Sequence, residues 1–257
     1  MHTSTVATAD TTDRTAARVA GIGYALIFVL AIYANFAVRM RLVDPDDAAA
    51  TTQNLAQSQT SVRLAVAAFI VVFLLDVAIA WALYVLFRPT GARRALHAAW
   101  FRLTYTVFLG MASVFLFLAL RLATADAYRD GFGGDQVNRS VMLALDAFDY
   151  AWLIGLAAFG IHLILVGRIM NKSGVAPVPL AWALMAAGVA YLADTFARTL
   201  AADYQNIAAT MLVVVAVPSV VGELAFTIWL LTRDARRIPE PAGAAHPEPH
   251  QASVALR

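Results

Sequence analysis

Two carboxyl groups stand in stretches of sequence that are otherwise almost entirely apolar. Asp76 lies within Phe69–Tyr84, and Glu223 lies within Met211–Leu231, five residues after Pro218. A charged group at such a position inside a membrane costs several kcal/mol unless it is paired, protonated or beside water. The chemistry open to these residues is therefore ion pairing, ligand binding or proton transfer in an apolar surrounding.

The helical rise places other polar residues at the level of these two carboxyl groups. At about 1.5 Å per residue, Asp76 and Glu223 lie roughly 18 Å and roughly 15 Å from the ends of their helices predicted to face the cytoplasm. Arg102 starts roughly 8 Å from that face, so its side chain could reach toward Glu223 or extend back to the membrane surface. The predicted ligand-binding residues are Asp76, Arg102, Tyr105, Glu223 and Tyr24.

A second polar level is predicted nearer the opposite face of the membrane. It contains Asp149, roughly 28 Å from the cytoplasmic face, and Asp194, roughly 24 Å from it, together with Tyr191. Asp194 and Arg198 are four residues apart on one helix, so we interpret them as a structural ion pair. His162 is interpreted as a packed histidine near the cytoplasmic interface.

The elements that must position these residues are membrane helices. Of the 257 residues, 61% are hydrophobic and 14% are charged, whereas an ordinary soluble domain is about half apolar and about a quarter charged. Six apolar runs are long enough to cross a bilayer, so the predicted fold class is an all-α integral membrane helical bundle. The predicted spans are approximately Arg18–Val38, Val62–Phe87, His97–Leu122, Asp146–Arg168, Pro179–Leu200 and Ala208–Leu231. An earlier start of the fourth span is left open, because Asn138–Leu145 is also helix-like and could form an amphipathic entry turn.

The remaining segments are predicted to be leads, tails and loops. We expect a disordered cytoplasmic lead over residues 1–17, a transmembrane domain over 18–232 and a disordered cytoplasmic tail over 238–257. The polar segment after the first span is expected to start a helix, with Pro45 near its first turn and acids at its N-terminus. The acid- and glycine-rich segment Ala123–Gln136 is expected to be a loop.

The basic residues predict the orientation of the bundle. Arginines and the single lysine, Lys172, are denser in the short connections on the side of the two termini. The positive-inside rule therefore favours cytoplasmic N- and C-termini.

Several classes of function are excluded by what the sequence lacks. There are no cysteines, which excludes disulfides, thiolate nucleophiles and cysteine-ligated metals. The net charge is +2, and no basic run is dense enough to predict nucleic-acid binding. Neither a metal nor a cofactor is predicted.

The chain resembles a bacterial membrane protein family described as domain of unknown function 4386. The resemblance runs from about Arg18 to Leu231 and implies a bacterial cell-membrane protein, without implying an activity. Among the residues that match the family pattern are Asp76, Arg102, His162, Asp194 and Glu223. The segments that carry the resemblance are Arg18–Tyr24, Asp47–Arg63, Asp76 with Leu83-Tyr84, Phe101-Arg-Leu, Phe159-Gly-Ile-His-Leu, Ser173-Gly-Val-Ala-Pro177, Gly188-Val-Ala-Tyr191 with Asp194, and Gly222-Glu223-Leu with Trp229-Leu-Leu.

Three functions follow as hypotheses from these features. The first is a protein that binds a small amphipathic or lipid-like molecule in the bundle core. The second is an intramembrane enzyme that acts on an isoprenoid- or lipid-like substrate, with Asp76 and Glu223 as acid and base. The third is a proton-coupled transporter, against which the absence of an internal repeat counts. The partners predicted are the lipid bilayer and a hydrophobic ligand, and the oligomeric state is left open.

Overall fold

The computed structural model describes residues 4–131 and 133–232, and these residues are almost entirely helical. The long helices are α1 (Ser4–Ala31), α4 (Gln59–Phe87), α5 (Ala92–Thr124), α7 (Gly134–Ser173), α8 (Val178–Leu200) and α9 (Gln205–Thr232). The shorter ones are the π-helix η1 (Ile32–Arg39), α2 (Met40–Leu42), α3 (Ala48–Gln57), the 3-10 helix η2 (Arg88–Thr90) and α6 (Asp126–Gly131). Residues 238–257, the predicted tail, lie outside the described residues.

Six helical segments in the described chain are long and apolar enough to span a membrane, which confirms the predicted class. The sequence places every one of them, although the structure extends most of their ends. The segments are Arg14–Leu42, Gln59–Thr90, Ala92–Thr124, Gly134–Ser173, Val178–Leu200 and Gln205–Thr232.

Three helices begin within polar stretches of the sequence, outside the predicted apolar spans. α7 begins at Gly134, well before the predicted Asp146, because Val137 and Val141 continue its buried face while the polar residues between them face outward. α6 also forms inside the segment predicted to be a loop. α1 begins at Ser4, so it runs through most of the predicted unstructured lead.

α3 begins where the polar segment predicts a helix. Its N-cap is Asp47, whose carboxylate accepts a hydrogen bond of 2.8 Å from the backbone N–H of Ala50. This bond satisfies a free amide of the first turn. Pro45 lies in the turn just before the helix, near its first turn as expected.

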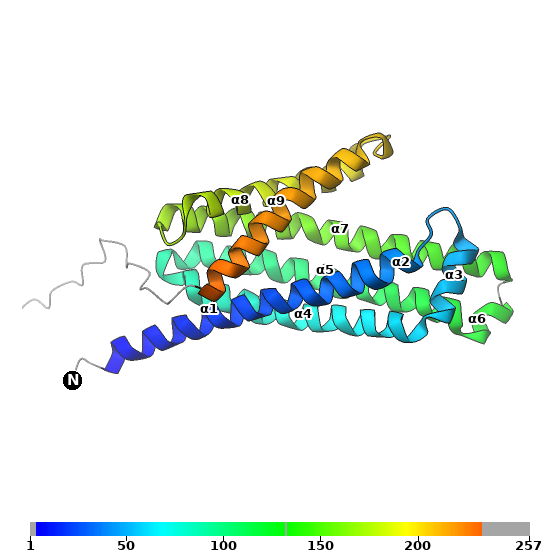
Figure 1. Cartoon of the computed structure of the whole chain (residues 1–257), viewed down its shortest axis with the longest axis horizontal. Helices are drawn as coiled ribbons and strands as arrows, with labels where there is room; N and C mark the ends of the chain where they lie inside the picture. The colour runs from blue at the N-terminus through cyan, green and yellow to red at the C-terminus, as the bar shows by residue number, and fades with distance from the viewer. Residues whose placement is uncertain (1–3, 132, 233–257) are drawn as a thin grey trace, which may run out of the picture.

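The bundle has two distinct ends. One, here called the terminal end, holds the start of the first span, the turns at 88–91 and 174–177 and the end of α9. The other, the α3 end, holds α3, α6 and the turn at 201–204. Figure 1 shows the long helices running between these ends, with the α8–α9 pair slanting away from the others toward its 201–204 turn.

The buried apolar residues form two cores, one in each half of the bundle. The terminal-half core draws on all six long helices, including Leu184 of α8 and Phe226 of α9. The α3-half core draws on η1, α3, α4, α5 and α7, and no residue of α8 or α9 belongs to it. The first buried residue of α9 is Ser219, so about four turns of the helix before it contain no fully buried residue.

Glycines bring α7 and α8 together in the terminal half. A Cβ added at Gly188 would lie 2.3 Å from the carbonyl oxygen of Gly160, and one at Gly160 would lie 2.6 Å from that of Gly188. The two backbones therefore touch, as small residues allow in membrane helices. This contact fixes α8, and with it the side chains that α8 presents to α9.

Candidate functional site

The guanidinium group of Arg102 is the centre of a buried polar network. Arg102 on α5 and Asp76 on α4 are each 1% exposed and form an ion pair. Arg102 also donates a hydrogen bond to the hydroxyl of Tyr24 on α1. The pairing compensates the cost of burying two charges in an apolar bundle.

Aromatic rings cover the same guanidinium group. Its central carbon lies 4.5 Å from the ring centroid of Tyr24 and 5.5 Å from that of Phe159. Both distances fall within the range of a cation–π contact. Tyr24 therefore contacts Arg102 through its hydroxyl and its ring.

His162 on α7 closes the network on another side. Its Nδ1 lies 2.8 Å from the carbonyl oxygen of Ala98. Since a carbonyl can only accept, Nδ1 carries a hydrogen. The Nε2 atom then faces the guanidinium of Arg102 at 3.4 Å. His162 is 1% exposed, so it is packed as expected, and it also belongs to the buried network around Arg102.

Glu223 lies beside this network and has a different environment. It is partly buried, and its Oε1 accepts a hydrogen bond of 2.9 Å from the hydroxyl of Tyr191. Among the described residues, Tyr191 alone donates a hydrogen bond to this carboxyl group. Glu223 also interacts electrostatically with Arg102 and Asp76. One carboxyl group is thus enclosed and paired, and the other is still accessible.

The predicted ligand-binding set is only partly one cluster. Tyr24, Asp76 and Arg102 are in direct contact, but Arg102 reaches toward Asp76 and not to Glu223 or to the membrane surface. Tyr105 packs against Phe159 with ring centroids 4.8 Å apart. Tyr105 also interacts electrostatically with Asp76 and Glu223, so it lies between the two carboxyl groups.

Two atoms of the ion pair remain without partners. Asp76 Oδ2 and Arg102 Nε are buried and have no hydrogen-bond partner among the described residues. Buried polar atoms of this kind are uncommon, because each one loses its hydrogen bonds to water. The network can therefore accept and donate further hydrogen bonds.

The second polar level divides into two clusters. Arg39 of η1 pairs with Asp149 of α7 at 2.8 Å and donates to Asn35 at 2.8 Å. Asp194 pairs with Arg198 at 3.4 Å, as the spacing predicts, and accepts a hydrogen bond of 2.5 Å from Tyr204. The structure therefore brings Asp149 and Asp194 into separate clusters and places Tyr191 in contact with neither.

Tyr191 joins the other carboxyl group instead, because its hydroxyl reaches from α8 to Glu223 on α9. Distance along one ideal helix does not predict this bond, since it ignores the length of the side chain. His162 and Phe159 were also not expected at this site. Their only signal in the sequence is that both occur in the segment Phe159-Gly-Ile-His-Leu shared with the family.

Tyr204, outside the spans, has a shifted titration. Burial, and after it the hydrogen bond to Asp194, raises the pKa of the Tyr204 hydroxyl above its ordinary value. The side chain of Arg198 lies over its ring, 4.8 Å from the centroid. The cluster ties the end of α8 to the start of α9.

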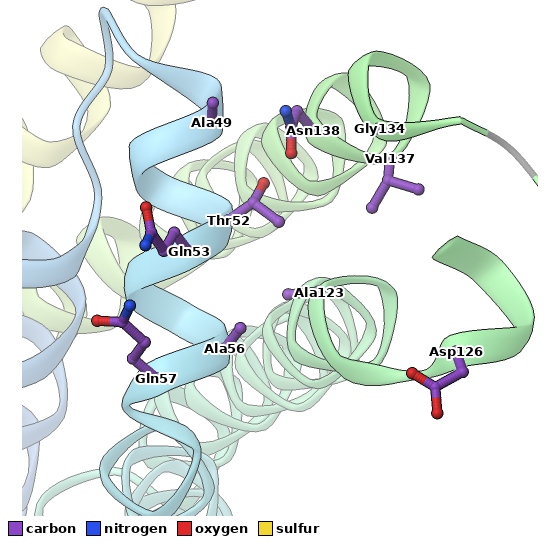
Figure 2. Close-up of a pocket in the computed structure, with 10 residues that line it drawn as sticks. All are labelled: Ala49, Thr52, Gln53, Ala56, Gln57, Ala123, Asp126, Gly134, Val137 and Asn138. Carbon is purple, nitrogen blue, oxygen red and sulfur yellow. The ribbon is translucent and has the colours of Figure 1, made fainter. Parts of the chain in front are cut away.

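A separate cleft of about 710 Å³ opens at the α3 end, between α3, the α5–α6 junction and the start of α7. Figure 2 shows Thr52 and Ala56 of α3 turned toward Asn138 and Ala123 across it. None of the residues of the Arg102 network or the Glu223 pair lines this cleft. In the part of the chain that the structure describes, no group of histidines and acids is arranged to hold a metal ion.

The six apolar spans and the enclosed charges define an α-helical multi-pass membrane protein. Residues 19–233 match the model of the family described as domain of unknown function (DUF4386), and the chain belongs to that family. No curated protein and no solved structure matches the chain.

Proposed function

We propose that this protein binds an amphipathic, lipid-like molecule inside the membrane, and that the polar group of that molecule contacts Glu223 and Tyr191. The observation that carries this proposal is the incomplete bonding of Glu223. Its Oε1 receives the Tyr191 hydroxyl, and no other hydrogen bond from the described residues reaches the carboxyl group. A carboxyl group has about four acceptor positions, so it can receive a ligand donor as well.

The position of Glu223 along α9 supports access from the bilayer. Toward the terminal end, Phe226 and Leu230 are buried in the terminal-half core. In the other direction, Val217, Val220 and Val221 are more than half exposed. Glu223 stands between the buried Gly222 and Leu224, which is 46% exposed, so a lipid-like molecule would reach it from the bilayer without crossing the bundle.

The chemistry of the site favours a ligand that donates a hydrogen bond. A carboxyl group beside a tyrosine hydroxyl suits an alcohol or an amine. The Arg102 guanidinium also interacts electrostatically with Glu223. The surrounding valines and the aromatic rings of Tyr105 and Phe159 match an apolar body. Binding sites for small molecules usually combine such an apolar lining with few polar groups.

The role of the Arg102 network in this proposal is indirect. Asp76, Arg102 and Tyr24 are each at most 2% exposed, so they fix the electrostatic field around Glu223 and do not touch the ligand. The enzyme hypothesis then depends on Glu223, since Asp76 is engaged by Arg102. That hypothesis and the transport hypothesis stay predictions.

The test is mass spectrometry of lipophilic molecules that co-purify with the full chain and with two variants of one position. We expect a specific molecule to be retained by the wild type and lost from Glu223→Leu. Glu223→Gln distinguishes an alcohol ligand from an amine ligand. An amide oxygen still accepts a hydrogen bond from an alcohol, so an alcohol should be retained. An uncharged amide does not neutralise an ammonium group, so an amine should be lost. Asp194→Asn is the matched control, since it removes a carboxyl group from the neighbouring helix.

Two outcomes would overturn the proposal. One is bulk lipid alone in every sample. The other is a specific molecule that Glu223→Leu retains at the wild-type level. A catalytic role instead predicts a chemically changed molecule in the wild type and the unchanged precursor in Glu223→Gln.

A further inference from the structure

A stripe on one face of α7 runs from apolar to basic toward the terminal end. Ile161, Ile164 and Leu165 are followed at helical spacing by Arg168 and Lys172. Together with Arg94 of α5, these residues line a cavity of about 240 Å³. The cavity thus has an apolar part within the membrane span and a basic part at its end.

The basic part carries three positive charges, and none of the described residues that line the cavity is acidic. In the described ranges, the ion pairs of the protein involve other residues, and none includes Arg94, Arg168 or Lys172. Arg94 makes a hydrogen bond of 3.3 Å to the carbonyl oxygen of Thr90. Arg168 and Lys172 are four apart on one helix, which brings like charges together at a cost. An anion bound between them would remove that repulsion.

We propose that this cavity binds the headgroup of an anionic phospholipid. The phosphate lies among Arg94, Arg168 and Lys172, and an acyl chain runs along Ile161, Ile164 and Leu165 into the bilayer. Basic pockets between membrane helices are suited to such headgroups. Arginine adds paired hydrogen bonds to phosphate oxygens. This site is separate from the proposed ligand site at Glu223 and does not depend on it.

A second groove on the same protein provides a contrast. It has a volume of about 390 Å³ and is lined by α1 and α4 residues, among which Arg18 is the basic one. Its apolar lining resembles that of the α7 stripe, but it lacks the cluster of charges. Any lipid seated there should therefore be held without preference for a negative headgroup.

The experiment is a lipid titration of the purified full chain in a neutral detergent, followed by native mass spectrometry. The probes are phosphatidylglycerol and phosphatidylcholine with the same acyl chains. We expect wild type to bind phosphatidylglycerol more tightly. Each lost charge should weaken that binding about fivefold, and Arg94→Gln/Arg168→Gln/Lys172→Gln should weaken it about a hundredfold. Binding of phosphatidylcholine should not change.

Arg93→Gln and Arg18→Gln are the controls. Arg93 is the sequence neighbour of Arg94 and is exposed at the same end, but it does not line the cavity. Equal loss in Arg93→Gln and Arg94→Gln would overturn the proposal, because it would show an unspecific charge effect. Equal affinity of wild type for both lipids would overturn it as well. Glycerol phosphate, which has no acyl chains, should fail to displace phosphatidylglycerol. If it displaced the lipid at a concentration similar to that of the lipid, the cavity would be a site for soluble anions instead.

Discussion

The two halves of the bundle bury their residues in different ways. In the terminal half, six helices enclose one core, in which α8 supplies Leu184 and α9 supplies Phe226. In the α3 half, α4, α5 and α7 form the core with η1 and α3, while α8 and α9 stand outside it. The terminal half therefore holds the helices together, and the α3 half exposes their sides to the bilayer.

The polar network lies at the border between these halves. Tyr105 contacts both cores, and Glu223 is placed just before α9 loses its buried face. An ionisable group at this border can be held by the packed half and reached through the open half. The difference between the two halves thus explains why the Asp76 carboxyl group is paired and enclosed, whereas the Glu223 carboxyl group is only partly buried.

The largest effect is expected from breaking the Arg102–Asp76 pair. Arg102→Met leaves the Asp76 carboxylate buried without a partner, which should lower the free energy of unfolding by about 3–5 kcal/mol. The measurement is equilibrium unfolding in mixed micelles. Arg102→Met/Asp76→Leu should recover much of that stability, because neither charge remains. Equal loss in the single and double variants would contradict the assigned pairing.

A comparison within α9 tests the two halves directly. Phe226 is fully buried, whereas Val213 is 59% exposed. Phe226→Ala should therefore lower the free energy of unfolding by about 3 kcal/mol or more. Val213→Ala should change it by about 0.5 kcal/mol or less. Similar losses at both positions would show that α9 is packed along its whole length.

The contact between α7 and α8 provides a smaller test. Gly188→Val places methyl groups against the backbone of Gly160 and should lower the free energy of unfolding by about 1–3 kcal/mol. Ala193→Val adds the same kind of bulk at an exposed position of α8 and is the control. An unchanged stability in Gly188→Val would mean that α8 is not fixed by this contact.

The smallest effect is expected at the tip of the α8–α9 pair. Arg198 is 47% exposed in its ion pair with Asp194, so Arg198→Gln should cost less than about 1 kcal/mol. The raised pKa of Tyr204 stabilises the folded state below the ordinary tyrosine value and ceases to do so as pH rises through the folded value. An ultraviolet titration, with Tyr204→Phe as reference, should show this phenol ionising late. A normal pKa would contradict the hydrogen bond to Asp194.

The sequence predicts the spans well because their signal is local. Apolar length alone locates each span, and the four-residue spacing of Asp194 and Arg198 predicts their pair. The early start of α7 is only partly predicted, through the helix-like segment Asn138–Leu145, because exposed polar residues mask a buried stripe through Val137 and Val141. For Asp76, helical depth indicates a core position but names no partner.

Partners depend on the lateral order of the helices, which no single helix encodes. Arg102 could have met either carboxyl group, and its choice of Asp76 follows from the adjacency of α4 and α5. The bond between Tyr191 and Glu223 follows from the adjacency of α8 and α9. The split of the second polar level has the same cause, since Asp149 and Asp194 face different neighbours.

The cluster of Asp194, Arg198 and Tyr204 has a mechanical consequence. Its ion pair lies within α8, while its hydrogen bond and its ring contact join the end of α8 to Tyr204 in the turn that leads into α9. Further along α8, the contact of Gly188 with Gly160 holds the same helix against α7. A tilt of α8 about that contact would leave the turn attached to α8 while it moves Tyr191, and the Glu223 carboxyl bonded to it, relative to the charge of Arg102.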